Sequence, residues 1–212
     1  MIKDKFLTKY LKKNSYRVYN AVRLISKTQY KNNFFYFQSK KKNKKLNSNY
    51  INTIKTFELL LPHTFNFSNS KINYLIRKFK IKDKKQILDI CENSYPISRF
   101  TKDVNISNKF KKTYLSLWLR NYFLGKRGDD LIVAETKKGK IAGFCLVLIS
   151  GSNIQIDQII VKKQLRNKGI AKQLIEYLTF LKNIKKIIAG TDSTNKSAVA
   201  LYEKLAIFSQ FL

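Results

Sequence analysis

Three residues at a strand-to-helix junction have the types and spacing that suit a phosphate-binding turn. Residues 154–171 read IQIDQIIVKKQLRNKGIA, and within them Arg166, Gly169 and Ala171 give the pattern R-x-x-G-x-[GA]. Backbone N–H groups at the beginning of a helix have no intrahelical acceptor and lie at the positive end of the helix dipole. Small residues let that backbone approach a ligand closely. The stretch therefore predicts a phosphate or pyrophosphate site, with Arg166 and Lys168 adding charge-assisted contacts.

An ordinary basic turn would show the same three residues, so the neighbouring pattern matters. Residues 191–195 read TDSTN and stand between an expected strand at 186–190 and an expected helix at 197–205. Four residues share one face of that helix: Ala198, Leu201, Tyr202 and Leu205. A second polar loop therefore follows the next strand, in the same position relative to its helix as the basic turn.

The elements that must position these residues are predicted from residue 83 onwards. We expect helices over residues 83–95 and 110–124, with Asp83 and Gln86 as a capping pair and Gly125 as a C-terminal cap. Strands follow in an antiparallel meander that the basic turn closes, and a helix follows the turn. The predicted strands are 131–135, 141–149 and 154–161, and the predicted helix is 170–181.

Residues 1–80 give weaker signals, and we treat them as a smaller N-terminal α/β segment on the substrate side. Apolar spacing predicts helices over 5–26 and 71–80. Strands are expected at 33–38 and 58–61. Residues 81–212 would then form the main domain.

The composition leaves two interpretations of the charge. The chain has 212 residues and a formal net charge of +30, with 44% hydrophobic residues. Such charge attracts nucleic acid, anionic membranes or phosphorylated substrates. The lysines are scattered along a chain rich in Lys, Asn and Ile, which also fits drift towards AT-rich coding. Nucleic-acid binding is therefore a secondary expectation.

Several function classes are disfavoured by the sequence. The two cysteines, Cys91 and Cys145, stand in apolar contexts and indicate no disulfide framework. His63 is the only histidine, so we expect no metal site and no histidine-based triad. The longest apolar run, residues 141–149, is too short to cross a bilayer, and no signal peptide is apparent. We expect a cytoplasmic protein without membrane association, and the oligomeric state, a homodimer included, is left open.

The order of motifs resembles the GNAT acyltransferase superfamily, which uses acetyl-CoA. The resemblance covers roughly residues 83–208 and is strongest in QLRNKGIA at 164–171 and TDSTNKSAVALYEKLAIF at 191–208. It implies an α/β fold with a mixed, mostly antiparallel central sheet flanked by helices. It also implies direct transfer of an acetyl group from the thioester to an amine.

The resemblance assigns the cofactor-binding residues. The turn would hold the pyrophosphate, the end of the third meander strand would pair with the pantetheine amides, and Asn195 would hydrogen-bond the pantetheine arm. The residues assigned in this way are Ile159, Ile160, Val161, Arg166, Asn167, Lys168, Gly169, Ile170, Ala171 and Asn195.

Two residues are catalytic candidates. Tyr202 falls where the family places the general acid that protonates the departing sulfur, although packing on the apolar helix face is the alternative. Asp157, within the apolar third strand, is the candidate to hold a water that accepts the proton of the amine. A satisfied carboxylate on the solvent side of the sheet is the alternative for Asp157.

A narrower resemblance concerns the dTDP-fucosamine acetyltransferase branch, which acetylates an amino sugar linked to a nucleotide. It rests on SRFTKDVNIS at 98–107, on the helix with Tyr114, Trp118 and Asn121 that ends at Gly125, on DLIVAE at 130–135 and on GTD at 190–192. It implies a nucleotide amino sugar as the substrate, and Arg99 and Asp103 in this segment would bind it or shape its cleft. The alternative for these two residues is a surface ion pair. A protein amine as substrate, and a basic nucleic-acid-binding protein on a relict scaffold, are the rival hypotheses.

The C-terminal end departs from the family pattern. Ala206 stands where the family prefers glycine, and the chain ends soon after Phe208, where the family has a longer final strand. These departures leave open an incomplete substrate side, and with it a degenerate or partner-completed protein.

Overall fold

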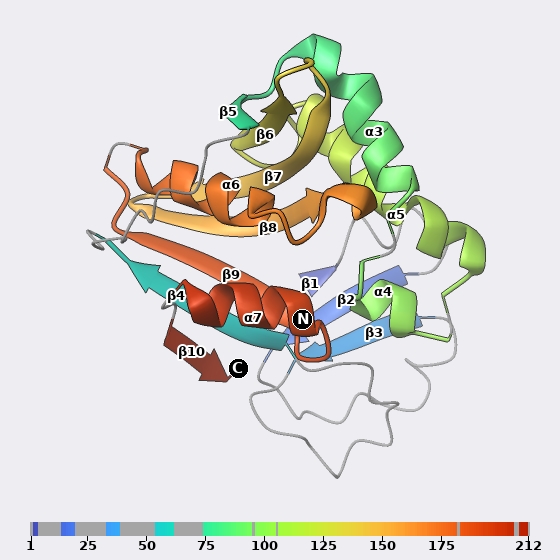
Figure 1. The fold of residues 1–212 in the computed structure, drawn as a ribbon. Helices are drawn as coiled ribbons and strands as arrows, with labels where there is room; N and C mark the ends of the chain where they lie inside the picture. Colours follow the sequence, from blue (N-terminus) through green and yellow to red (C-terminus); the bar gives the residue numbers. More distant parts are fainter. Residues whose placement is uncertain are drawn as a thin grey trace.

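The structure is a computed structural model in which the placed residues form two sheets and their covering helices (Figure 1). It describes residues 2–3, 14–19, 33–38, 54–61, 74–94, 96–104, 106–181, 183–205 and 208–211. Side chains are described within residues 54–205, apart from Arg99 and the gaps between these ranges.

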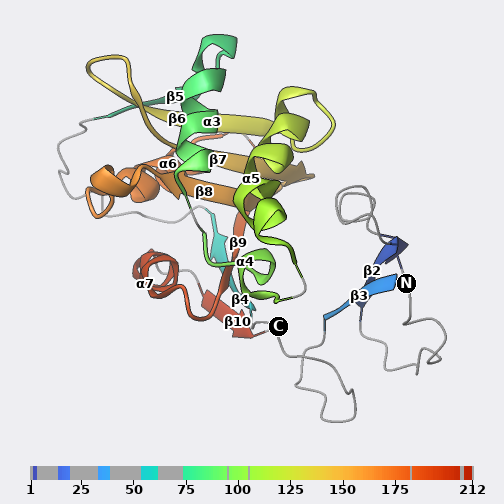
Figure 2. The same cartoon turned by 90° about the vertical axis from the view of Figure 1, so that its right-hand side faces the viewer.

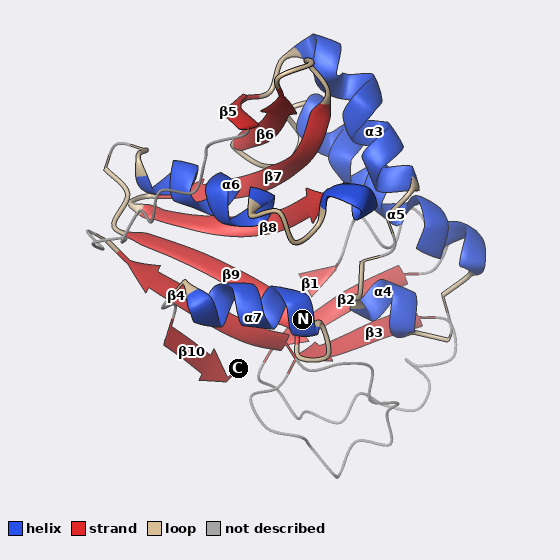
Figure 3. Ribbon diagram, viewed as in Figure 1, coloured by secondary structure: helices blue, strands red, loops and turns tan. Residues whose placement is uncertain are grey.

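A seven-stranded mixed sheet forms the centre of the molecule, with strand order β10-β4-β9-β8-β7-β6-β5 (Figure 3). Neighbouring strands are antiparallel except β8 and β9, which are parallel. The strands are β4 (Ile54–Leu60), β5 (Tyr74–Lys78), β6 (Asp130–Thr136), β7 (Ile141–Ser150), β8 (Asn153–Val161), β9 (Lys186–Asp192) and β10 (Phe208–Phe211). The predicted meander of three antiparallel strands is therefore confirmed as β6, β7 and β8.

A separate three-stranded sheet comes from the N-terminal part of the chain. It contains β1 (Ile2–Lys3), β2 (Asn14–Tyr19) and β3 (Asn33–Gln38), with β2 and β3 parallel. The predicted strand at 33–38 is confirmed. The helix predicted over 5–26 is wrong at residues 14–19, which extend as β2, and the rest of that prediction lies outside the described residues.

Helices cover both faces of the central sheet, as Figure 2 shows along its edge. On one face lie α3 (Lys84–Glu92), α4 (Arg99–Lys102) and α5 (Asn108–Phe123), whose apolar side chains form one core with β6 and β7. On the other face, α6 (Ile170–Thr179) and α7 (Lys196–Lys204) pack a second core. The central sheet is buried on both faces, so β7 is apolar almost throughout.

Two strands of the central sheet come from the first 80 residues. β4 is the predicted strand at 58–61, extended at its beginning, and it pairs with β9 from Ile54 opposite Asp192 to Leu60 opposite Lys186. β10 pairs with the other edge of β4. Beyond β9 the sheet is therefore continued by β4, a strand from the N-terminal segment, and then by β10. Ala206 lies outside the described residues.

The helix predicted over 71–80 is wrong, because residues 74–78 form the edge strand β5. Tyr74 and Ile76 pack against the core below α6, whereas Leu75 between them is 62% exposed. This alternation has period two, and the helical spacing of the apolar residues was coincidental. Pairing with β6 stabilises these residues as a strand.

The capping pair predicted at the beginning of α3 is also absent. Asp83 ends the short 3₁₀ helix η1 (Ile81–Asp83), and its carboxylate accepts hydrogen bonds from Arg77 at 2.6 and 2.9 Å. Arg77 also donates to Glu135 on β6 at 2.6 Å. Gln86, the other member of the pair, instead accepts from the backbone N–H of Ile141 at 3.0 Å. Both side chains therefore bind α3 to the sheet.

Candidate active site

The central sheet opens between its two parallel strands. β8 and β9 pair only from Asn153 opposite Lys186 to Ile156 opposite Ala189. Beyond that point β8 stays paired with β7 as far as Val161, and β9 stays paired with β4 as far as Asp192. The second half of β8 therefore has one edge that no described strand covers. The predicted pantetheine-binding residues Ile159, Ile160 and Val161 lie on this edge.

A β-bulge marks the point of separation. Opposite β7, Leu146 pairs with Gln158 and the next residue, Val147, pairs with Ile156, so Asp157 is the extra residue. The bulge changes which face each later residue of β8 occupies, since Ile156 packs in the α6 and α7 core whereas Ile160 packs in the α3 and α5 core. Bulges bend a strand and increase its twist, which accounts for the divergence of β8 from β9 here.

The predicted phosphate turn follows β8 directly. After the 3₁₀ helix η2 (Lys163–Leu165), Asn167 and Gly169 take left-handed backbone angles, with φ of 61° and 78°. The side chains of Arg166, Asn167 and Lys168 are exposed, and Ile170 is buried as the first residue of α6. Ala171 is the second helical residue and is half-buried.

This turn fits an anionic phosphate group. A Cβ at Gly169 would meet only Gln173 at 3.9 Å, so the backbone there is open to a ligand. The N–H groups of the first turn of α6 have no acceptor within the helix and carry its positive partial charge. Arg166 donates to the backbone carbonyl of Val161 at 3.4 Å, which holds its stem beside the end of β8.

Asn195 has a structural role at the beginning of α7. Its side-chain oxygen accepts from the N–H of Ala198 at 3.4 Å and from the hydroxyl of Ser197 at 3.1 Å. Its side-chain nitrogen donates to Thr191 at 3.3 Å. Asn195 is thus the N-cap of α7, and contact with the pantetheine arm stays a prediction.

Tyr202 lies in the core between α7 and the sheet. Only 3% of the residue is exposed, and its ring centroid is 5.3 Å from that of Phe57 on β4. None of the described residues hydrogen-bonds its hydroxyl. Burial raises the pKa of Tyr202 above its ordinary value, so the hydroxyl keeps its proton throughout the neutral range. Packing and proton donation are compatible at this position.

Asp157 is surrounded by hydrogen-bond donors. Its Oδ2 accepts from Trp118 Nε1 at 2.8 Å, from the Tyr122 hydroxyl at 2.7 Å and from Arg127 Nε at 2.9 Å. Its Oδ1 accepts from Arg127 Nη2 at 2.7 Å. The Asp157 side chain is 6% exposed and that of Arg127 37%. The carboxylate points to the α5 side and is neutralised there by a two-point contact with Arg127.

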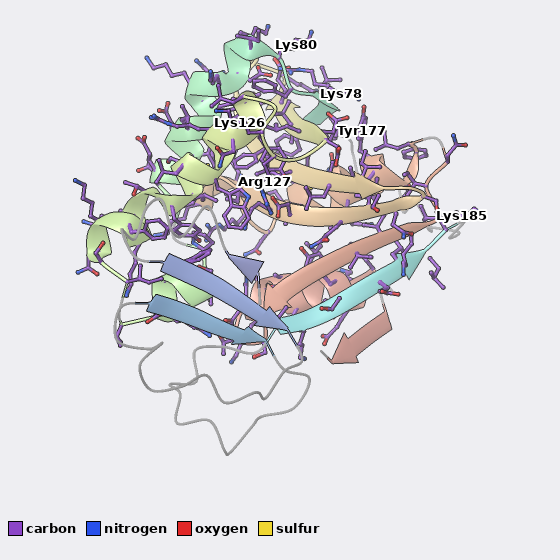
Figure 4. The ribbon with its side chains drawn as sticks, turned by 180° about the vertical axis from the view of Figure 1, so that it is seen from behind. Lys78, Lys80, Lys126, Arg127, Tyr177 and Lys185 are labelled. Atoms are coloured by element: carbon purple, nitrogen blue, oxygen red, sulfur yellow. The ribbon has the colours of Figure 1, made fainter. Side chains whose placement is uncertain are left out.

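The residues that hold Asp157 were not predicted from the sequence as its partners. Trp118 and Tyr122 are one turn apart on α5, and Arg127 lies over the Trp118 ring at 4.4 Å. Figure 4 labels Arg127 near the middle of the molecule, whereas Lys78 and Lys185 lie at its rim. The available signals were the i, i+4 spacing of two aromatic residues with polar tips and a lone carboxylate in an apolar strand, which requires donors.

The loop after α5 is built to bring Arg127 to this position. Gly125 has φ 63°, and its N–H donates to the carbonyl of Tyr122 at 3.0 Å. The N–H of Lys126 donates to the carbonyl of Asn121 at 2.8 Å. This is the Schellman ending of a helix, and it confirms the predicted cap. A Cβ at Gly128 would come within 1.7 Å of the Tyr122 ring, so only glycine fits there.

The predicted substrate residues lie at α4, on the face opposite α6 and α7. Arg99 is the first residue of α4, and its side chain is not described. Asp103 follows α4 and is only 4% exposed, so its side chain is buried. A cavity of about 480 Å³ lies beside α4, lined by Thr101 and Lys102 among others.

Other kinds of site are missing from the described part of the chain. No group of three His, Cys, Asp or Glu side chains there could hold a metal ion. The described helices include none long and apolar enough to cross a membrane. Cys91 and Cys145 are both buried free thiols.

In this sheet the two parallel strands, β8 and β9, separate beside the helix N-terminus that contains Gly169. Residues 88–207 match the model described as the Acetyltransferase (GNAT) family. The match covers more than half of the 212 residues, and the chain belongs to this family. A comparison with curated proteins found none that matches the sequence.

Solved structures share this fold at low sequence identity. A functionally unknown conserved protein from Staphylococcus epidermidis ATCC 12228 gives a TM-score of 0.56 at 13% identity, over 76% of this chain and 58% of that one. A candidate acetyl transferase from Pyrococcus furiosus gives 0.51 at 23% identity, over 66% and 95%. A GCN5-related N-acetyltransferase from Sphaerobacter thermophilus gives 0.49 at 16% identity, over 76% and 50%. The chain thus spans just over half of the first of these proteins.

Proposed function

We propose that the protein is an acetyl-CoA-dependent N-acetyltransferase and that its acceptor is the amino group of a nucleotide-linked amino sugar. The observation that carries the first part is the separation of β8 from β9 beside the Gly169 turn. A strand edge and a helix N-terminus meet there, one able to pair with amides and the other with a pyrophosphate.

Acetyl-CoA supplies an acetyl group activated as a thioester. The uncovered edge of β8 at Ile159, Ile160 and Val161 offers backbone groups to its amide-bearing arm. The exposed turn from Arg166 to Ala171 offers N–H groups and two cationic side chains to its phosphates. These residues bind and orient the donor, and α7 closes the same face of the sheet.

Tyr202 is the proposed proton donor. A departing thiolate needs a proton or a strong hydrogen bond as its charge develops. The raised pKa of Tyr202, caused mainly by burial, keeps the hydroxyl protonated at the pH of the reaction. Asp157 is better suited to positioning than to proton transfer, because Arg127 binds both of its oxygens.

The nucleotide amino sugar is proposed from the sequence motifs around α4 and β9. SRFTKDVNIS begins just before α4, and the GTD of residues 190–192 ends β9. The structure places the two motifs in contact, since Lys102 on α4 forms an ion pair with Asp192 at 2.7 Å. Arg99 is the residue of this segment proposed to bind the substrate.

Thermal unfolding with acetyl-CoA tests the donor site first. Saturation at about 100 times the dissociation constant should add roughly 2.7 kcal/mol to the free energy of unfolding. An unchanged melting temperature would contradict the proposal. Turnover of dTDP-linked amino sugars against peptide N-termini then tests the acceptor, and Arg99→Ala should lower sugar turnover without changing acetyl-CoA binding.

Tyr202→Phe tests the proton donor. The variant keeps the ring that packs on Phe57 and removes only the hydroxyl. We expect kcat to fall at least ~10-fold while the melting temperature and the acetyl-CoA affinity stay close to those of the unmodified protein. An unchanged kcat would assign Tyr202 to packing alone.

A further inference from the structure

A cavity with a strongly cationic lining lies between α4, the beginning of α5 and the loop that joins β9 to α7. Its volume is about 480 Å³, and two apolar residues before α4 form part of its wall. The described polar residues that line it are Thr101, Lys102, Asn108, Lys111, Lys112 and Thr194. Three of these six are lysines, and the described lining contains no carboxylic acid, so this part of the cavity is complementary to an anion.

Lys102, on the wall of the cavity, forms an ion pair with Asp192 at the end of β9. Its ammonium group lies 2.7 Å from Asp192 Oδ1 and 2.9 Å from Thr194 Oγ1. The Asp192 side chain is only 1% exposed. The carboxylate at the end of β9 is therefore already paired, and it does not offset the positive charge of the other two lysines.

Lys111 and Lys112 keep their charges available to a ligand. Neither side chain forms an ion pair or a hydrogen bond with a residue that the structure describes. Lys112 is exposed and Lys111 half-buried, on the second turn of α5. Both lysines line the cavity without a described counter-ion, so an anion bound there would be attracted by both charges.

The beginning of α5 adds to the same field. Ser107 is its N-cap and accepts from the N–H of Phe110 at 3.3 Å, which leaves other N–H groups of the first turn without an acceptor in the helix. Asn108, the first helical residue, lines the cavity. The 16-residue helix therefore directs its positive end and two lysines towards one cavity.

The cavity lies beside the opening of the sheet, on the acceptor side. Thr194 is the second residue after the end of β9, the strand that separates from β8. α4 and α5 cover the face opposite α6, whose N-terminus holds the proposed pyrophosphate turn (Figure 2). A ligand in the cavity would approach the opening from the face that the donor does not use.

From this arrangement we infer that Lys111, Lys112 and the N-terminus of α5 bind phosphate groups of the acceptor substrate. This inference rests on the proposed function, and it assigns the phosphate recognition of a nucleotide-linked acceptor to these lysines. The 3′-phosphate of coenzyme A has the same chemistry, so the experiment has to separate the two sources.

The test uses the double variant K111Q/K112Q and isothermal titration with dTDP in the presence of saturating coenzyme A. The control is K137Q/K138Q, which removes the same charge from the exposed turn between β6 and β7. We expect the dissociation constant for dTDP to rise at least about tenfold in K111Q/K112Q, since charged hydrogen bonds are lost, and to change little in the control. Thymidine, which has no phosphate, should bind both variants equally.

Three outcomes would overturn the inference. The first is an equal dTDP affinity in K111Q/K112Q and the control, and the second is no binding of dTDP to the unmodified protein. The third is a loss of coenzyme A affinity in K111Q/K112Q that disappears with dephospho-coenzyme A, which would assign the lysines to the donor. Acetyl-CoA binding and turnover of an uncharged amine are measured separately, so failure of this site is distinguishable from failure of the acetyltransferase proposal.

Discussion

Asp157 was a catalytic candidate, but its hydrogen bonds favour a structural role. It is the extra residue of the bulge in β8, and all its hydrogen bonds lead to α5 and the loop after it. A carboxylate with four donors has little remaining capacity to accept a proton from a substrate. We therefore regard it as the anchor that fixes where β8 leaves β9.

The variant Asp157→Asn should distinguish a structural role of Asp157 from a role as the catalytic base. The amide removes the charge that neutralises Arg127, so we expect the free energy of unfolding to fall by about 1–3 kcal/mol, less than for a fully buried pair because Arg127 is partly exposed. Urea denaturation measures this loss. The acetyl-CoA dissociation constant should rise as well.

The pH dependence of kcat would show whether Asp157 is instead the catalytic base. If the carboxylate were the base, Asp157→Asn would abolish the acidic limb of the kcat profile with stability almost unchanged. An anchor predicts a lower stability and an acidic limb that keeps its midpoint. The companion variant Tyr122→Phe, which removes one donor, should give a smaller version of the anchor result.

Cys91 makes stability depend on alkaline pH. Burial raises the pKa of its thiol from 9.0 to about 12. The thiol stays protonated in the folded state while the unfolded state ionises, so this stabilising contribution is complete below pH 9 and is lost as the pH rises towards 12. From pH 8 to about pH 10 we expect the free energy of unfolding to fall by about 1.4 kcal/mol from this group. Urea denaturation of Cys91→Ala should show a shallower fall, and an identical slope would contradict the assignment.

At the scale of elements, acetyl-CoA binding at the turn before α6 should depend on the backbone conformation of that turn. Gly169 has φ 78°, where any other residue is strained by about 1–2 kcal/mol. Gly169→Ala should therefore weaken acetyl-CoA binding by distorting the N–H groups of the turn, although the protein still folds. Calorimetric titration measures the affinity.

The matched control for this variant is Gly151→Ala. Gly151 has φ 57° in the turn between β7 and β8, and a Cβ there would meet no atom within 4 Å. Its strain is similar but it lies at the opposite end of β8. Both variants should lose comparable stability, and only Gly169→Ala should lose affinity. An equal affinity in the two would remove the turn from the donor site.

Local patterns predicted those elements whose neighbours are close in sequence. The meander, the helix after the basic turn and the ending of α5 at Gly125 all follow from short-range periodicity and turn chemistry. The edge strand β5 does not, because its conformation depends on pairing with β6 more than fifty residues later. The same holds for Arg127, whose partner Asp157 lies 30 residues away.

The β-bulge in β8 is the feature of the site that could not be predicted from the sequence. Strict alternation along IQIDQIIV would place Ile154, Ile156 and Ile160 on one face, and the structure places Ile160 on the other. A bulge inserts one residue without a mark in the sequence, and here the inserted residue, Asp157, is bound by donors on α5 and in the loop after it. The sequence predicted a strand edge at Ile159, Ile160 and Val161, and no described strand covers that edge, whereas the bulge that precedes it was not predicted.

For the whole molecule, the net charge of +30 sets how stability responds to salt. The chain has 43 lysine and arginine residues against 13 acidic ones, so repulsion between like charges acts over distances that dissolved ions screen. Between about 0.05 M and about 0.3 M NaCl we expect the melting temperature to rise, since screening reduces the repulsion. Differential scanning calorimetry measures it, and a fall would mean that the ion pairs dominate.

The place of β4 has a consequence for how the chain is made. β4 lies in the sheet between β9 and β10, which are synthesised about 130 and about 150 residues later. At about 5–20 residues per second, β4 has to wait on the order of ten seconds on the ribosome before β9 exists. During that time Phe57 and Leu59, which become fully buried, are exposed to solvent. Lys55 and Glu58 place two charged residues within this strand, and charges of that kind commonly protect aggregation-prone strands.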